Sequence, residues 1–81
     1  MSVLSTYIKE VADAKGMLHQ ERLRALRWYI KASTDKELIP AIRALTELEH
    51  MRILQEAGLR EPLATVMLRR YDDLVERRKR R

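Results

Sequence analysis

The sequence contains no cysteine and no asparagine, and only two glycines and two prolines among its 81 residues. Without cysteine, the chain cannot form disulfides, zinc–thiolate sites or a thiol nucleophile. The shortage of glycine, proline and asparagine leaves few residues suited to tight turns, whereas the strong helix formers leucine, alanine, arginine and glutamate are abundant. These features predict an all-α protein.

Long apolar runs are missing as well. No stretch approaches the roughly 20 residues that span a bilayer, and the first residues do not follow the basic-then-apolar order of a signal peptide. We therefore expect no membrane partner and a cytoplasmic location. A chain of 81 residues suffices for one domain, whose core is small enough that self-association often completes it. We expect residues 1–76 to form this helical domain and residues 77–81 to form a basic C-terminal tail.

The charge balance and the missing catalytic motifs together favour binding over catalysis. A net charge of +5 favours polyanionic partners such as nucleic acid, or an acidic protein. The serines at positions 2, 5 and 33 have no evident histidine and acid partners, and there is no glycine-rich phosphate loop. We therefore expect a protein that is not an enzyme and needs no cofactor.

Apolar residues of helical spacing occupy one face from residue 3 to residue 14, and the pattern continues with little change of phase to residue 29. Gly16 interrupts it. Because one residue is too short for a hairpin turn, we predict one long or kinked helix from Ser2 to Ala32. A break at Gly16 is the alternative.

Thr34 and Glu37 form a capping-box pattern, in which hydroxyl and carboxylate satisfy free backbone N–H groups at the start of a helix. We predict a hairpin turn at residues 33–36, followed by a helix from Asp35 to Ala57. Its apolar residues advance repeatedly by three, which rotates the apolar stripe around the helix. The helix therefore either breaks near residues 49–50 or turns its two halves toward different neighbours.

Gly58 is the predicted C-cap of that helix, and Pro62 opens a last helix that ends near Arg78. The apolar face of this last helix is wide enough to contact two partners, one of which could be another subunit. Arg70 lies within it and must extend to solvent or meet a buried carboxylate. The pattern predicts an antiparallel hairpin or bundle of three to four helices, completed by self-association through Leu68, Tyr71 and Val75.

Two basic clusters are candidate sites for nucleic acid or an acidic protein. The first combines cations with an indole that can stack on a base: Arg24, Arg27, Trp28 and Lys31. Its alternative is a solvated basic face with Trp28 packed against another helix. The second suits sequence-independent phosphate contacts: Arg69, Arg77, Arg78, Lys79, Arg80 and Arg81. Its alternative is a frayed, solubilising tail.

Glu47 and His50 have the Glu-x-x-His spacing of carboxylate-bridged di-iron bundles, although an exposed helix face explains the same spacing. Together with residues 21–29 (ERLRALRWY) and 32–38 (ASTDKEL), this motif resembles the ferritin-like superfamily, most closely its encapsulated-ferritin type. The resemblance covers about residues 21–56. It implies a hairpin that dimerises into a four-helix bundle and holds iron through Glu47 and His50.

One ligand position of that family departs from the pattern. Where the family has a metal-binding glutamate in the first helix, this chain has Arg22. Because a guanidinium cannot bind iron, we predict that Arg22 forms a structural ion pair with Glu47 or another carboxylate.

Three hypotheses for the function follow. The first is a non-enzymatic binding or assembly module that engages nucleic acid or an acidic protein through its basic face and arginine-rich tail. The second is a ferritin-like half-bundle that dimerises around an intact or degenerate metal site at Glu47 and His50. The third is a structural helical bundle, natural or designed, without a ligand.

Overall fold

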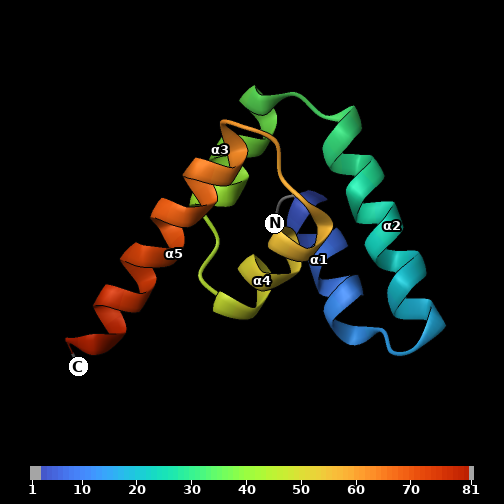
Figure 1. Ribbon diagram of the computed structural model, residues 1–81, viewed down its shortest axis with the longest axis horizontal. Coiled ribbons are helices and arrows are strands. Elements are labelled where there is room, and N and C mark those ends of the chain that lie inside the picture. The colour runs from blue at the N-terminus through green and yellow to red at the C-terminus, as the bar shows by residue number, and fades with distance from the viewer. Residues whose placement is uncertain (1–2, 81) are drawn as a thin grey trace.

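The structure, a computed structural model, describes residues 3–80, and this part of the chain is helical without any strand (Figure 1). The all-α prediction is confirmed. The helices are α1 (Val3–Asp13), α2 (Met17–Ala32), α3 (Asp35–Arg43), α4 (Leu48–Ala57) and α5 (Leu63–Lys79). They number five rather than three to four, because each of the first two predicted helices is divided.

The long helix predicted from residue 2 to residue 32 is wrong, and the alternative break at Gly16 is confirmed; Ser2 itself lies outside the described residues. Gly16 adopts φ 63° and ψ −135°, a conformation open almost only to glycine. The chain therefore reverses, and α2 packs beside α1 (Figure 1). Tyr7 and Tyr29 stack across this contact with ring centroids 4.7 Å apart.

We expect Gly16→Ala to lower the free energy of unfolding by about 1–3 kcal/mol, since any Cβ strains this backbone conformation. Nothing lies within 4 Å of the added methyl group, so the loss would come from the backbone alone. Urea denaturation followed by circular dichroism measures it. Lys15→Ala, at the exposed neighbouring position, is the control and should change the value by less than about 0.5 kcal/mol.

The capping box at the start of α3 is confirmed on its hydroxyl side, because the Glu37 N–H donates to the Thr34 hydroxyl at 3.3 Å. The continuous helix predicted from residue 35 to residue 57 is wrong. It ends at Arg43 and resumes at Leu48, so the break precedes the expected residues 49–50. The break lets the apolar faces of α3 and α4 reach one core, which a single helix with a rotating stripe could not do.

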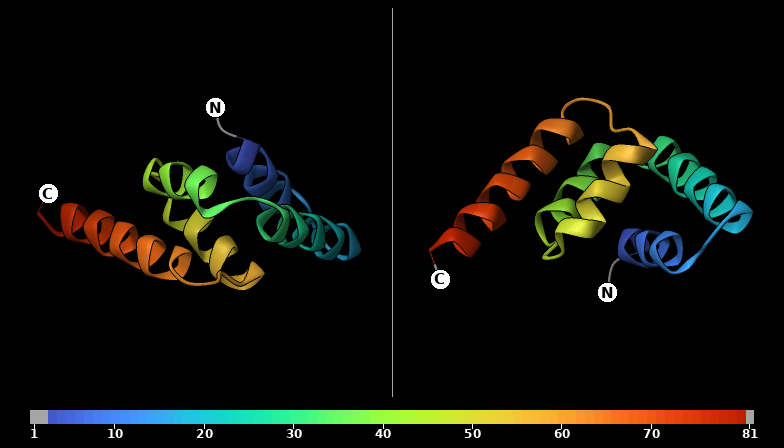
Figure 2. Two further views of the ribbon diagram at one scale, coloured as in Figure 1. Left: turned by 90° about the horizontal axis from the view of Figure 1, so that it is seen from above. Right: turned by 60° about the horizontal axis from the view of Figure 1, so that its bottom comes forward.

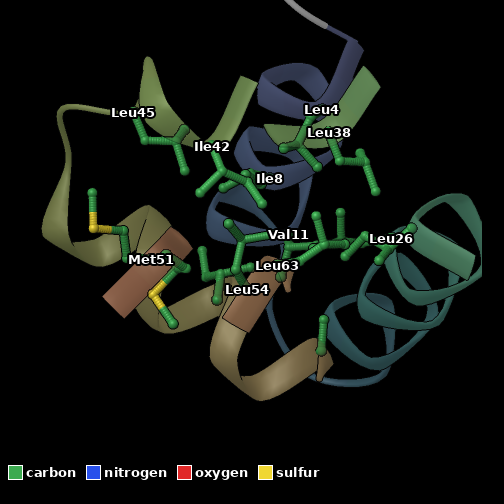
Figure 3. Close-up of a cluster of buried hydrophobic side chains, with 14 of the residues drawn as sticks. Leu4, Ile8, Val11, Leu26, Leu38, Ile42, Leu45, Met51, Leu54 and Leu63 are labelled. Atoms are coloured by element: carbon green, nitrogen blue, oxygen red, sulfur yellow. The ribbon is translucent and has the colours of Figure 1, made fainter. Parts of the chain in front are cut away.

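The core gathers around α4, which contacts α1, α2 and α5. Its fully buried side chains come from all five helices and include Leu4, Ile8, Leu26, Leu38, Ile42, Met51, Leu54 and Leu63 (Figure 3). The buried residues of α5 are Leu63 and Met67, both in its first half. The second half of α5 continues outward to the C-terminus (Figure 1 and Figure 2). It thus exposes cations along much of its length.

Arg60, in the loop before α5, joins the end of α2 to the start of α3. Its guanidinium donates to the Ile30 carbonyl at 2.8 Å and to the Ser33 carbonyl at 2.7 Å. The same group forms an ion pair with Asp35 at 2.9 Å. The last carbonyls of a helix lack the full set of intrahelical donors. The Ile30 carbonyl also accepts from the Ser33 N–H at 3.3 Å, so Arg60 adds to the hydrogen bonds that close this helix end.

Two further arginines do the same for other helix ends. The Arg27 side chain donates to the carbonyl of Ala57, the last residue of α4, at 2.9 Å. The Arg70 side chain donates to the carbonyl of Leu45, just after α3, at 2.8 Å. Arg70 also pairs with Asp73 at 3.1 Å, so the arginine within the apolar stripe has both a carbonyl and a carboxylate. These three arginines, which the sequence alone suggests are solvated surface charges, therefore stabilise the tertiary structure by bonding to backbone carbonyls of other segments.

Candidate functional site

Positively charged side chains from two helices gather where the end of α3 meets the middle of α5. A surface pocket of about 310 Å³ is lined there by Arg43, Arg69 and Arg70, together with Val66 and Asp73. The side of α5 that carries Arg69 continues through positions 73, 76, 77 and 80, which helical spacing places on one face. We call the five arginines of this region the arginine surface: Arg43, Arg69, Arg70, Arg77 and Arg80.

Two acidic residues neutralise part of the arginine surface. Asp73 lies 3.1 Å from Arg70 and 3.4 Å from Arg77. Glu76 lies 3.8 Å from Arg80. Within residues 3–80, neither Arg43 nor Arg69 forms an ion pair, and both side chains are exposed. These two guanidiniums, one from each helix, are the ones available to a ligand.

The C-terminal run of cations does not form one patch. Residues 77–79 belong to the last turn of α5, so the boundary expected after residue 76 falls inside a helix. Arg78 points to a different side from Arg77 and lines a pocket at the start of α4 with Glu47, Glu49 and Arg52. Lys79 and Arg80 are exposed, and Arg81 lies outside the described residues. The predicted tail therefore divides its charge between two surfaces.

The side chains of the basic cluster predicted on α2 are exposed, but Arg27 differs from the others in its contacts. Trp28 is 69% exposed, so the interpretation in which it packs against another helix is wrong. Arg24 and Lys31 flank it without an ion pair to any residue from 3 to 80. Arg27 is held at the end of α4, as described above, and is therefore less free to bind a ligand.

Arg22 forms its ion pair with Glu10 of α1, at 3.7 Å, rather than with Glu47. Arg22 therefore pairs with a carboxylate, as predicted, but the partner is Glu10 and not Glu47. Because the chain reverses at Gly16, α2 lies against α1, and the acid on α1 is the nearer one.

Glu47 and His50 do not form a Glu-x-x-His pair within a helix. Glu47 occupies the N-cap position of α4 with extended backbone, and only His50 lies in the helix. Both line one pocket with Lys9, yet no group of three or more His, Cys, Asp or Glu within residues 3–80 is placed to hold a metal ion. The donor set of one chain does not fit iron. A site shared between two copies stays a prediction.

The residues predicted for self-association lie along one edge of α5. Leu68 is 50% exposed, and Tyr71 and Val75 are half-buried. Leu68 also lines a surface pocket between α4 and α5. The edge therefore exposes apolar surface, and association through it stays a prediction.

The sequence pattern did not identify Arg43 and Arg60 as structurally important. Arg43 is the last residue of α3 and lies beside α5 there. The apolar pattern instead predicted that position 43 lies inside a longer helix. Arg60 contacts residues 25 to 30 positions earlier, and no local pattern signals such contacts. The only available signal was an arginine in a loop that could donate to the free carbonyls at a helix C-terminus. Using this signal would have required knowing where each helix ends.

No family model, curated protein or solved structure matches this chain. Nothing in those comparisons bears on the ferritin-like resemblance. In the described part of the chain, no helix combines the length and the apolar character needed to cross a bilayer. A proposal for the function therefore depends on the chemistry of the two surfaces described above.

Proposed function

We propose that this protein is a non-enzymatic nucleic-acid-binding module that contacts the phosphate backbone through the arginine surface. The observation that carries the proposal is the convergence of arginines from α3 and α5 around one pocket, with two of them unpaired. Five arginines face two acids in this region, which leaves an excess of three positive charges. A guanidinium binds phosphate oxygens in a bidentate manner, and this geometry suits a phosphodiester better than a lone cation would.

Arg70 supports this site without being free itself. Its bond to the Leu45 carbonyl fixes the middle of α5 against the segment that follows α3, and its bond to Asp73 within α5 orients the guanidinium. Arg43 and Arg69 are thereby presented from two anchored helices rather than from a flexible tail. Such preorganisation lowers the entropy cost of binding. Phosphate contacts alone predict affinity that depends on salt and little on sequence.

We expect the double variant Arg43→Gln/Arg69→Gln to bind a mixed-sequence DNA duplex about tenfold more weakly, since each exposed charge contact contributes a few tenths to 1 kcal/mol. The slope of log K against log salt should become shallower by about two, because two phosphate contacts are lost. Fluorescence anisotropy of a labelled duplex at four salt concentrations measures both quantities.

Lys9→Gln/Lys15→Gln is the matched control, because it removes the same charge from exposed positions on and after α1. Its affinity should fall less, and its salt slope should stay within about half a unit of the parent. Equal losses in the two variants would mean that net charge, not the arginine surface, determines binding. Absence of duplex and single-strand binding at low salt would remove the nucleic-acid proposal altogether.

An acidic protein is the alternative ligand for the arginine surface. We also propose that the protein assembles into an antiparallel bundle through α5. The exposed edge at Leu68 lies on a different side of α5 from Arg69, because adjacent helical positions are 100° apart. Self-association and phosphate binding are thus compatible in one molecule.

A further inference from the structure

The outer face of α2 carries a largely apolar seam that no helix within residues 3–80 covers. Its positions follow the alternating three- and four-residue spacing of a helix-packing stripe. All of them are exposed, and we call them the α2 seam: Leu18, Glu21, Ala25, Trp28 and Ala32. Met17, 84% exposed, lies beside its first turn. Three of the five large hydrophobic residues that are exposed within residues 3–80 therefore belong to α2.

The seam is flanked by unequal charges. Arg24 and Lys31 lie along one flank, and neither forms an ion pair within residues 3–80. On the other side, Arg22 is already paired with Glu10. A partner would thus meet an apolar stripe that is bordered on one side by two cations without an ion pair.

We propose that the α2 seam binds an amphipathic helix of a partner protein that carries acidic residues along one border. Ala25 and Ala32 allow a second helix to approach closely, and Trp28 supplies the large aromatic anchor typical of interface centres. Acidic residues on the partner would meet Arg24 and Lys31 and would fix its direction and register. This proposal is independent of nucleic-acid binding, since α2 and α5 lie at opposite ends of the molecule (Figure 1 and Figure 2).

Two other occupants fit less well. Glu21 lies within the seam two turns before Trp28, where it would repel the phosphates of a strand stacked on the indole. A second copy paired antiparallel about Ala25 would bring Arg24 close to its own counterpart, and like charges in contact oppose association. An acidic helix avoids both conflicts when its carboxylates lie only along the border that faces Arg24 and Lys31 and an apolar residue lies opposite Glu21.

The test uses the fact that Trp28 is the only tryptophan of the chain. A designed helical peptide with leucine and alanine on its seam, and glutamate only along the border that faces Arg24 and Lys31, is titrated into the full chain. We expect the Trp28 emission to shift to shorter wavelength as the indole leaves water. The matched peptide, with lysine in place of each glutamate, should bind at least tenfold more weakly.

Variants locate the contact by anisotropy of the labelled acidic peptide. We expect about a thirtyfold loss of affinity for Trp28→Ala, as for a central aromatic anchor. Arg24→Gln/Lys31→Gln should lose about tenfold, as for two exposed charge pairs. Val3→Ala, which removes a 57% exposed apolar side chain from α1, is the control and should leave the affinity unchanged.

Four results would overturn the proposal. These are no emission shift with the acidic peptide at millimolar concentration, equal binding of both peptides, a larger shift with a single-stranded oligonucleotide, or a shift produced by raising the protein concentration alone. The third would assign the seam to nucleic acid, and the fourth would assign it to a second copy. Duplex binding by the arginine surface is measured separately, so its failure leaves this outcome unaffected.

Discussion

Leu54→Ala is expected to lower the free energy of unfolding by about 2–5 kcal/mol, the range for removing a buried leucine side chain and leaving a cavity. Leu54 is 0% exposed and belongs to α4, the helix that contacts α1, α2 and α5. It lies in the same cluster as Val11 and Leu63 (Figure 3). Because three helices meet α4, the site has little freedom to collapse, which favours the upper part of the range.

The loss is large for so small a domain. Stabilities of about 0.05–0.15 kcal/mol per residue give roughly 4–12 kcal/mol for a chain of this length. Chemical denaturation of the variant, monitored by circular dichroism, measures the change. Leu68→Ala removes the same atoms from a half-exposed position, and we expect it to cost less than about 1 kcal/mol. Similar values for the two variants would show that α4 is not the centre of the core.

Arg60→Met is expected to destabilise the protein by about 2–3 kcal/mol. Methionine keeps the length of the side chain but removes the donors to the Ile30 and Ser33 carbonyls. Hydrogen bonds from a charged donor contribute about 1.5–3 kcal/mol, and partial access of water keeps the sum of the two near the middle of that range. The midpoint of urea unfolding, at unchanged slope, measures the effect.

Two variants separate the carbonyl bonds from the ion pair. Asp35→Asn removes only the Arg60–Asp35 pair, whose side chains are 39% and 40% exposed, so it should cost less than about 1 kcal/mol. Arg52→Met, at an exposed arginine of α4, should cost less than about 0.5 kcal/mol. If Arg60→Met cost no more than Asp35→Asn, the carbonyl bonds would contribute nothing measurable.

Part of the candidate site could be predicted from the sequence, because those residues belong to a single helix. Arg69, Arg77 and Arg80 could be predicted because they lie in one helix, and helical spacing brings them to one face. Arg43 belongs with them only because α3 ends beside α5. The exposure of Trp28 could not be predicted, because it depends on which helices cover α2, and the local sequence pattern does not contain that information.

The sequence by itself determined the all-α class, the capping at Thr34, the glycine at the end of α4 and the start of the last helix beside Pro62. Each of these depends on residues within one turn of one another, where propensity and capping act directly. Only the tertiary structure decided that the chain reverses at Gly16, that the second helix divides at residues 44–47 and that Arg27, Arg60 and Arg70 serve helix ends. Those outcomes depend on contacts between residues 25 to 30 positions apart and on burying every apolar face in one core, which local patterns do not encode.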